Sequence, residues 1–173
     1  YLEILSEAGI IGISLIVLFL IFILRNSFYI IKKIYQTDNA ELMILAPVIT
    51  QTVTYHKDDQ NQINGYLALP ENIDQNIPGI ILIHEWWGLN DDIRKKADYF
   101  ASQGYAALAV DLYNGENTVE PVKARKLAGN VRGNMDEAFS NLKAALEYLK
   151  RQPGVNSQKL ASIGWCFGGG WSY

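Results

Sequence analysis

The chain has 173 residues, which is long enough for one domain with a hydrophobic core. Its formal net charge is −3, with 15 basic and 18 acidic residues scattered along it, so we expect no nucleic-acid partner. The single cysteine, Cys166, excludes an intrachain disulfide and a cysteine-based zinc site. That cysteine is therefore either a buried filler or a reactive thiol.

The first predicted element is a membrane-spanning helix over residues 8–24, "AGIIGISLIVLFLIFIL". This run has no charge and would span roughly 25 Å, at the short end for a transmembrane helix. A signal peptide would need a basic segment before the run, whereas Glu3 and Glu7 stand there. A buried helix of a soluble domain is the alternative. Basic residues follow the run, so we expect a single-pass protein inserted in the lipid bilayer, with its C-terminal side in the cytoplasm.

The opening "YLEILSEAGIIG" resembles the segment that enters a late transmembrane helix in the O-antigen ligase and polymerase family. This resemblance covers about the first thirty residues and implies that the chain joins the tail of one membrane protein to the head of another protein. Because the chain starts with Tyr1 rather than Met, we expect the true start of the gene product to be missing. We divide the chain into a membrane and juxtamembrane segment (1–35), a linker (36–47) and a soluble part (48–173).

The soluble part alternates between strand and helix patterns. Alternating or continuous apolar runs predict strands over residues 46–56, 63–70, 79–85, 105–113 and 159–166. Helical spacing predicts helices over residues 90–104, 119–130 and 134–151. The first of these helices has Asn90 or Asp91 as its cap. Phe139, Leu142, Ala145, Leu146 and Leu149 are predicted to form the buried stripe of the last one.

This order of elements predicts an α/β fold, a doubly wound and mostly parallel sheet with helices on both faces. Reactive groups in such sheets lie beyond the carboxyl ends of the strands. The segments "HEWWG" (84–88) and "DLYNGE" (111–116) and Cys166 each follow a predicted strand, so we expect all three at one edge of the sheet.

"GWCFGGG" (164–170) has the Gly-x-Cys-x-Gly spacing of the nucleophile elbow of α/β-hydrolases, with a thiol in place of a serine hydroxyl. Gly164, Gly168 and Gly169 would allow the strained strand-to-helix turn that the nucleophile needs. The N–H of Phe167, with a second N–H from Trp86, would then bind the developing oxyanion. Inert packing of the cysteine is the alternative.

"GIILIHEWWGLNDDIRKKADYFASQGYAALAVDLYNGE" together with "ASIGWCFGGG" resembles the dienelactone hydrolase family of α/β-hydrolases, from about Thr50 to the last residue. The resemblance implies hydrolysis of a small-molecule ester or lactone by a Cys–His–Asp triad, without metal or other cofactor. It assigns Cys166 as nucleophile, Glu85 as the carboxylate that switches the cysteine between thiol and thiolate, and Trp86 and Phe167 as oxyanion donors.

Two further assignments keep alternatives. Arg125 lies in a helix where the family places a carboxylate-binding arginine, and a solvated surface arginine is the other interpretation. Trp86 and Trp87 either line an acyl pocket or cover the sheet. Glu85 ends a buried strand, where a carboxylate needs a partner.

The sequence departs from the family in its histidines. His56 and His84 both precede the cysteine, whereas the order in α/β-hydrolases is nucleophile, acid, histidine. Asp111 also comes too early to be the triad acid and is expected to hold a loop by hydrogen bonds. We therefore expect the acid and the histidine after residue 173, and we expect the chain as given to be a truncated hydrolase with little or no esterase activity.

A second hypothesis treats the chain as a membrane-anchor or polysaccharide-ligase tail whose soluble half is a passenger without activity. A thiol redox module is a third, but it needs a resolving cysteine, and the sequence has one cysteine only.

Overall fold

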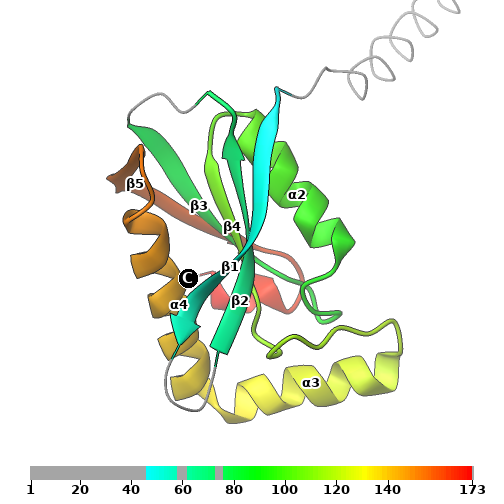
Figure 1. Cartoon of the computed structure of the whole chain (residues 1–173). Coiled ribbons are helices and arrows are strands. Elements are labelled where there is room, and N and C mark those ends of the chain that lie inside the picture. The colour runs from blue at the N-terminus through cyan, green and yellow to red at the C-terminus, as the bar shows by residue number, and fades with distance from the viewer. Residues whose placement is uncertain (1–45, 58–61, 73–75, 173) are drawn as a thin grey trace, which may run out of the picture. The chain divides into compact units, whose positions relative to one another are not determined.

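The structure, a computed structural model, describes residues 46–57, 62–72 and 76–172 (Figure 1). The predicted membrane helix at residues 8–24, most of the linker and the ligase-like opening lie outside the described residues. Among the residues that are described, no helix combines the length and apolarity needed to cross a membrane.

Five strands form one sheet in the order β1-β2-β4-β3-β5. Their bounds are β1 Val48–Lys57, β2 Gln62–Pro70, β3 Ile77–Ile83, β4 Ala106–Val110 and β5 Val155–Gly164. β3 pairs in parallel with both β4 and β5, whereas β2 runs antiparallel to β1 and β4. All five predicted strands are therefore present. The sheet is parallel where β3 lies between β4 and β5, and β1 and β2 form an antiparallel hairpin at the other side.

The described residues include three α-helices: α2 Asp91–Ser102, α3 Pro121–Gly133 and α4 Met135–Lys150. α2 packs on β2 and β4, and α4 packs on β1, β3 and β4, on the other side of the sheet (Figure 1). α3 contacts α4. Of the two predicted caps for α2 the structure selects Asn90, whose side-chain oxygen accepts a hydrogen bond from Ile93 N–H at 3.2 Å. The predicted doubly wound α/β architecture is thus confirmed for the described part.

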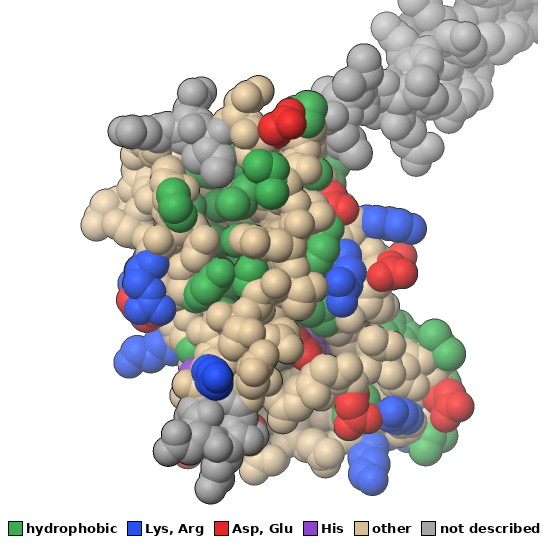
Figure 2. All heavy atoms as spheres, viewed as in Figure 1, with side chains coloured by type: hydrophobic (Ala, Val, Ile, Leu, Met, Phe, Trp, Pro, Cys, Tyr) green, Lys and Arg blue, Asp and Glu red, His purple; other side chains and the backbone are tan. Residues whose placement is uncertain are grey.

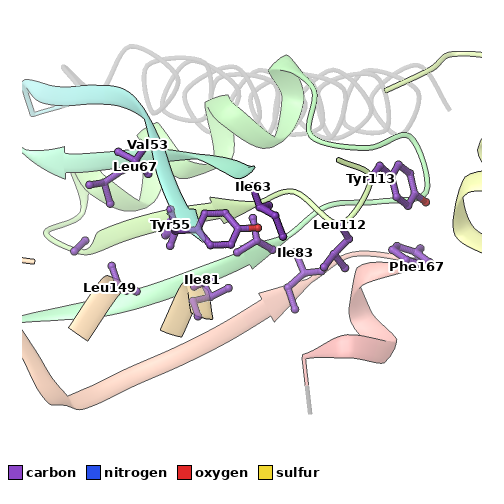
Figure 3. Packing of buried hydrophobic residues seen from close by; sticks show 14 of the residues in the cluster. Val53, Tyr55, Ile63, Leu67, Ile81, Ile83, Leu112, Tyr113, Leu149 and Phe167 are labelled. Atoms are coloured by element: carbon purple, nitrogen blue, oxygen red, sulfur yellow. The ribbon is translucent and has the colours of Figure 1, made fainter. Parts of the chain in front are cut away.

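Each face of the sheet has its own apolar layer because successive strand residues point to opposite faces. In β3, Ile81 and Ile83 belong to the layer under α4, and Ile80 and Leu82 to the layer under α2. Figure 3 shows the first layer continuing from Leu149 of α4 past Ile83 to two aromatic residues, Tyr113 and Phe167, at the carboxyl ends of the strands. The core therefore reaches directly to the edge where the reactive groups were expected.

The predicted buried stripe of α4 was wrong at Phe139, which is 51% exposed. Ala145 and Leu149 are buried as predicted, and Leu142 and Leu146 pack against the core while partly buried. Ala138 and Asn141 are buried in addition. Asn141 takes its place in the interior because its side chain is bonded there: Tyr55 Oη donates to Asn141 Oδ1 at 2.6 Å, and Asn141 Nδ2 donates to the Asp111 carbonyl at 2.8 Å. A buried polar network thus accounts for the burial of Asn141, which an apolar pattern does not predict.

Charged side chains of both signs lie around the face of the molecule drawn in Figure 2, without a large region of one sign. β5 pairs with β3 and with no other described strand, so it is an edge of the described sheet. An apolar groove beside it is lined by residues of β5, α4 and the segment after β5, among them Leu142, Leu146, Leu160 and Trp171.

Candidate active site

The carboxyl ends of three strands meet at one edge of the sheet. Ile83 at the end of β3 is paired with Val110 at the end of β4 and with Gly164 at the end of β5. The segments that follow these strands therefore start side by side, as the sequence predicted. They are the loop from His84, the loop from Asp111 and the turn that carries Cys166.

The turn after β5 has the geometry of a nucleophile elbow. Cys166 has φ of 53°, in the left-handed region that non-glycine residues rarely occupy and that stores about 1–3 kcal/mol of strain. A Cβ on Gly164 would lie 2.1 Å from the carbonyl oxygen of Gly168. A Cβ on Gly168 would lie 2.3 Å from the carbonyl oxygen of Ile83. Glycine is therefore required at positions 164 and 168, which bring the turn against the end of β3.

The remaining glycines of the motif have a looser role. A Cβ on Gly169 would make only ordinary contacts, and one on Gly170 would meet nothing within 4 Å. The chain continues from the turn into η1, a 3-10 helix over Gly168–Trp171. Two hydrogen bonds close the turn: Gly168 N–H donates to the Trp165 carbonyl at 2.9 Å, and Gly169 N–H donates to the Cys166 carbonyl at 3.2 Å.

Cys166 is exposed and lies at a pocket of about 370 Å³. We call this the Cys166 pocket, and its lining residues are Trp86, Arg125, Ala128, Arg132, Cys166 and Phe167. Four of the predicted site residues thus line one cavity: Trp86, Arg125, Cys166 and Phe167. The other two, Glu85 and Trp87, are half-buried in the same loop as Trp86 but are not among the lining residues. The Trp87 ring packs against that of Trp86, with centroids 4.7 Å apart.

Arg132 is a residue of the pocket that the sequence analysis missed. It follows Arg125 by seven residues, two turns of α3, so both guanidinium groups can reach the same side of the helix. Its Cζ lies 5.6 Å from the centroid of the Phe167 ring, a cation–π arrangement. The seven-residue spacing from Arg125 is visible in the sequence, but only the contact with Phe167 distinguishes Arg132 from the other basic residues of α3. The pocket accordingly joins a thiol to two exposed cations.

Phe167 forms the buried floor of the site, with 4% of its surface exposed. Its ring stacks on His84 at 5.8 Å, with the two planes 16° apart, and also packs on Tyr113 at 5.6 Å and on Trp171 at 6.1 Å. These contacts connect η1 to both neighbouring loops. They fix the main chain next to Cys166 even though the thiol itself is open to solvent.

The loop after β3 is held by Gly88 and by Tyr113. Gly88 has φ of 90°, and a Cβ there would lie 2.6 Å from the Glu116 carbonyl oxygen, so the motif needs glycine at this position. The hydroxyl of Tyr113 donates to the Trp86 carbonyl at 3.1 Å. Burial raises the pKa of Tyr113 to about 12, and the nearby Arg132 guanidinium opposes that rise. The phenol is therefore a neutral donor that anchors Trp86.

Asp111 holds the loop after β4, as the sequence analysis expected. Its carboxylate accepts hydrogen bonds from Tyr113 N–H at 2.8 Å and from Gly115 N–H. Its main chain is bonded to Tyr55, because the Asp111 N–H donates to the Tyr55 hydroxyl oxygen at 3.2 Å. With both of its oxygens engaged by the backbone, Asp111 shapes the loop and is not available to orient a histidine.

Neither histidine of the sequence is placed to act as a base for Cys166. His84 is fully buried and holds two main-chain groups. His56 lies in β1, opposite Ile63 of β2, and β1 is at the other edge of the sheet from β5. Within residues 46–57, 62–72 and 76–172, no group of three or more His, Cys, Asp or Glu side chains could hold a metal ion.

Comparison with known proteins agrees with this geometry. The sequence model described as "Dienelactone hydrolase family" matches residues 63–173. Protein usf of Aquifex pyrophilus is 35% identical over 123 residues, which cover 69% of this chain and 52% of that protein. Carboxymethylenebutenolidase of Pseudomonas putida is 28% identical over 129 residues, covering 70% of this chain and 53% of that enzyme.

Solved structures give the same result. The structure of m3DLH superposes with a TM-score of 0.66 at 32% identity, over 72% of this chain and 52% of that one. A dienelactone hydrolase-like promiscuous phosphotriesterase from metagenomic libraries superposes with a TM-score of 0.65 at 29% identity, over the same shares of the two chains. The chain thus spans about half the length of the relatives that it matches.

Proposed function

The chain belongs to the dienelactone hydrolase family, and we propose that it forms the nucleophile-bearing part of a hydrolase that cleaves ester or lactone bonds through Cys166. The observation that carries this proposal is the left-handed conformation of Cys166, which lies between two positions, 164 and 168, where only glycine fits. Strain of this kind persists only where the surrounding structure imposes it, and it is concentrated at functional sites.

The proposed reaction begins with the Cys166 thiolate. Its sulfur forms a bond to the carbonyl carbon of the ester, and the π electron pair moves to the carbonyl oxygen. The N–H groups of Trp86 and Phe167 are the proposed donors to that oxyanion, and among the described residues neither has another hydrogen-bond partner. Collapse of the tetrahedral species breaks the C–O bond of the ester. The alkoxide leaves and takes a proton from solvent water, and an acyl-thioester remains on Cys166. Water then hydrolyses this thioester.

Glu85 and Arg125 have proposed roles beside the nucleophile. Glu85 follows the end of β3 by two residues, as Cys166 follows the end of the neighbouring β5, and we assign it to the thiol–thiolate switch. Arg125 lines the Cys166 pocket, which supports a role in holding a carboxylate of the substrate. Trp86 supplies the apolar wall of the proposed acyl site, and Trp87 supports that wall by packing on it.

The described residues supply a nucleophile and oxyanion donors but no imidazole base. Deacylation should then be slow, because removal of one triad member leaves only the catalysis due to binding and to the oxyanion site. External imidazole can replace a missing base, so it should accelerate hydrolysis of a p-nitrophenyl ester by this chain. Imidazole also hydrolyses such esters without protein, so this background rate is subtracted. The remaining, protein-dependent acceleration must be absent in Cys166→Ala. Equal imidazole-dependent rates in the two proteins would contradict the proposed nucleophile.

A further inference from the structure

We propose that His84 is a positioning residue that aligns the Trp86 N–H for binding the oxyanion formed at Cys166. The inference rests on the proposed function and goes beyond it, since His84 itself touches neither substrate nor thiol. It acts through the peptide bond between Glu85 and Trp86 and through the ring of Phe167.

The hydrogen bonds of His84 identify its protonation state. The Leu112 N–H donates to His84 Nε2 at 3.2 Å, so Nε2 carries a lone pair. His84 Nδ1 lies 2.5 Å from the carbonyl oxygen of Glu85, which can only accept, so Nδ1 carries the proton. Both contacts are satisfied only by the neutral ring with its proton on Nδ1. The residue is fully buried, with every ring nitrogen in use.

The bond from Nδ1 fixes a peptide plane. The Glu85 carbonyl accepts from His84 Nδ1–H and also from the Gly88 N–H at 3.2 Å. The carbonyl of Glu85 and the N–H of Trp86 belong to one planar trans peptide unit and point in opposite directions, because the described chain has no cis peptide bond. Holding the carbonyl toward His84 therefore directs the Trp86 N–H away from it. Tyr113 holds the carbonyl of Trp86 itself.

His84 also contacts the other half of the proposed oxyanion site. Its ring is stacked on that of Phe167, and its carbonyl oxygen would lie 2.5 Å from a Cβ on Gly168. One buried residue thus touches both of the segments that present N–H groups to the oxyanion. Misalignment of either donor reduces oxyanion binding, which is sensitive to shifts well below 1 Å.

The surroundings of His84 keep the ring neutral. Burial lowers the pKa of His84, and the attraction of the nearby Asp111 carboxylate opposes this without offsetting it. Tyr113, whose ring centroid is 4.6 Å from that of His84, is neutral as well. A proton on Nε2 would face the Leu112 N–H and would break that hydrogen bond.

Two substitutions separate the two bonds of the ring. In His84→Asn the amide nitrogen can replace Nδ1 and still donate to Glu85, whereas in His84→Gln the amide oxygen can replace Nε2 and accept from Leu112. The probe for oxyanion binding is trifluoroacetone, whose carbonyl carbon is attacked by the Cys166 thiolate to give a tetrahedral adduct with a negatively charged oxygen. The adduct is observed by ¹⁹F NMR. Alkylation of Cys166 by iodoacetamide is the control, since displacement of iodide forms no oxyanion.

We expect His84→Gln to weaken the trifluoroacetone adduct about tenfold or more, and His84→Asn to retain most of the wild-type affinity. Alkylation rates should stay within about twofold in both, as expected when an oxyanion donor and not the thiol is disturbed. Equal loss of adduct in the two variants, or no loss in either, would overturn the positioning role. A wild-type chain whose Cys166 reacts with iodoacetamide but never adds trifluoroacetone would overturn the proposed nucleophilic function instead.

A measurement on the unmodified chain keeps the inference testable if the variants fail to fold. The sequence has two histidines, so long-range ¹H–¹⁵N correlation spectra contain two imidazole patterns only. One of them should show a neutral ring protonated on Nδ1, unchanged as the pH is lowered to about 6, below the ordinary pKa of histidine. A buried histidine that is protonated on Nε2 would contradict the tautomer on which the role of His84 depends.

Discussion

Substitution of Gly168 by alanine should destabilise the fold and at the same time disturb Cys166, the proposed nucleophile. The added Cβ would lie 2.3 Å from the Ile83 carbonyl oxygen, 2.5 Å from that of His84 and 2.8 Å from the Ile83 carbonyl carbon. All three are main-chain atoms at the end of a central strand, which cannot rotate away. Inserting a carbon into a well-packed interior costs about 1–3 kcal/mol, and a triple backbone contact places Gly168→Ala at about 3 kcal/mol or above.

Gly170→Ala is the matched control. Gly170 lies two residues away in the same short helix, and a Cβ there meets nothing within 4 Å. Neither glycine has a positive φ, so both alanines suit the local backbone and differ only in what they contact. Gly170→Ala should be neutral or should stabilise by up to about 1 kcal/mol through the unfolded state.

The free energies of unfolding come from urea denaturation, and the rate of Cys166 alkylation by iodoacetamide is measured on the same samples. We expect Gly168→Ala to lower the midpoint strongly and to change the alkylation rate, because η1 must move off the end of β3. If Gly168→Ala were as stable as Gly170→Ala, the close contact between the Cys166 turn and the end of β3 would be refuted.

Three further predictions concern the network, the pocket and the pH response. Tyr55→Phe should lose about 1–3 kcal/mol of unfolding free energy, because it leaves buried groups of Asn141 and Asp111 without their partner. Tyr66→Phe, which loses a half-buried bond to Asp98 of 2.7 Å, should lose about 1 kcal/mol or less, and equal losses in urea titrations would count against the network. Arg125→Gln and Arg132→Gln should each lower the ratio of alkylation rates for anionic iodoacetate over neutral iodoacetamide about two- to fivefold, with a smaller effect in high salt. An unchanged ratio would show that these cations do not act on ligands at Cys166. Burial lowers the pKa of His84 in the folded state. As the pH falls below about 6.5, His84 is therefore protonated in the unfolded chain before it is protonated in the folded chain. The contribution of His84 to the free energy of unfolding is therefore complete above about pH 6.5, and it declines toward the folded-state pKa by at most about 1.4 kcal/mol per pH unit. Urea titrations at several pH values measure this decline. An identical dependence of the unfolding free energy on pH in the wild type and in His84→Gln would contradict it.

The sequence predicted the features that depend on local patterns. Continuous apolar runs such as the one that became β3 arise because both faces of that strand are covered, and the run could be recognised without knowing what covers it. The convergence of Cys166 with the "HEWWG" loop followed from the rule that parallel strands end at one edge. Glycines 164 and 168 could be assigned to the elbow because no side chain fits there.

Features that depend on contacts between distant segments could not be predicted in this way. The burial of Asn141 in α4 depends on its bond to Tyr55, 86 residues earlier in the chain, and the sequence around Asn141 does not show that partner. The direction of β2 was also open, since the alternation of its side chains is the same in parallel and antiparallel pairs. Arg132 is one of several basic residues of α3, and only the position of Phe167 distinguishes it.

The assignment of Cys166 as the nucleophile is tested by its acylation in a single turnover. The folded chain is mixed with a small molar excess of p-nitrophenyl acetate, and the release of p-nitrophenol is followed by stopped flow. The modified residue is found by mass spectrometry after an acid quench. We predict a rapid release of one p-nitrophenol per chain, an acetyl group on Cys166 that persists until a base is supplied, and a slower reaction of the same thiol in urea. Acylation elsewhere in the chain, or a thiol that reacts no faster when folded than when unfolded, would contradict the assignment of Cys166 as nucleophile.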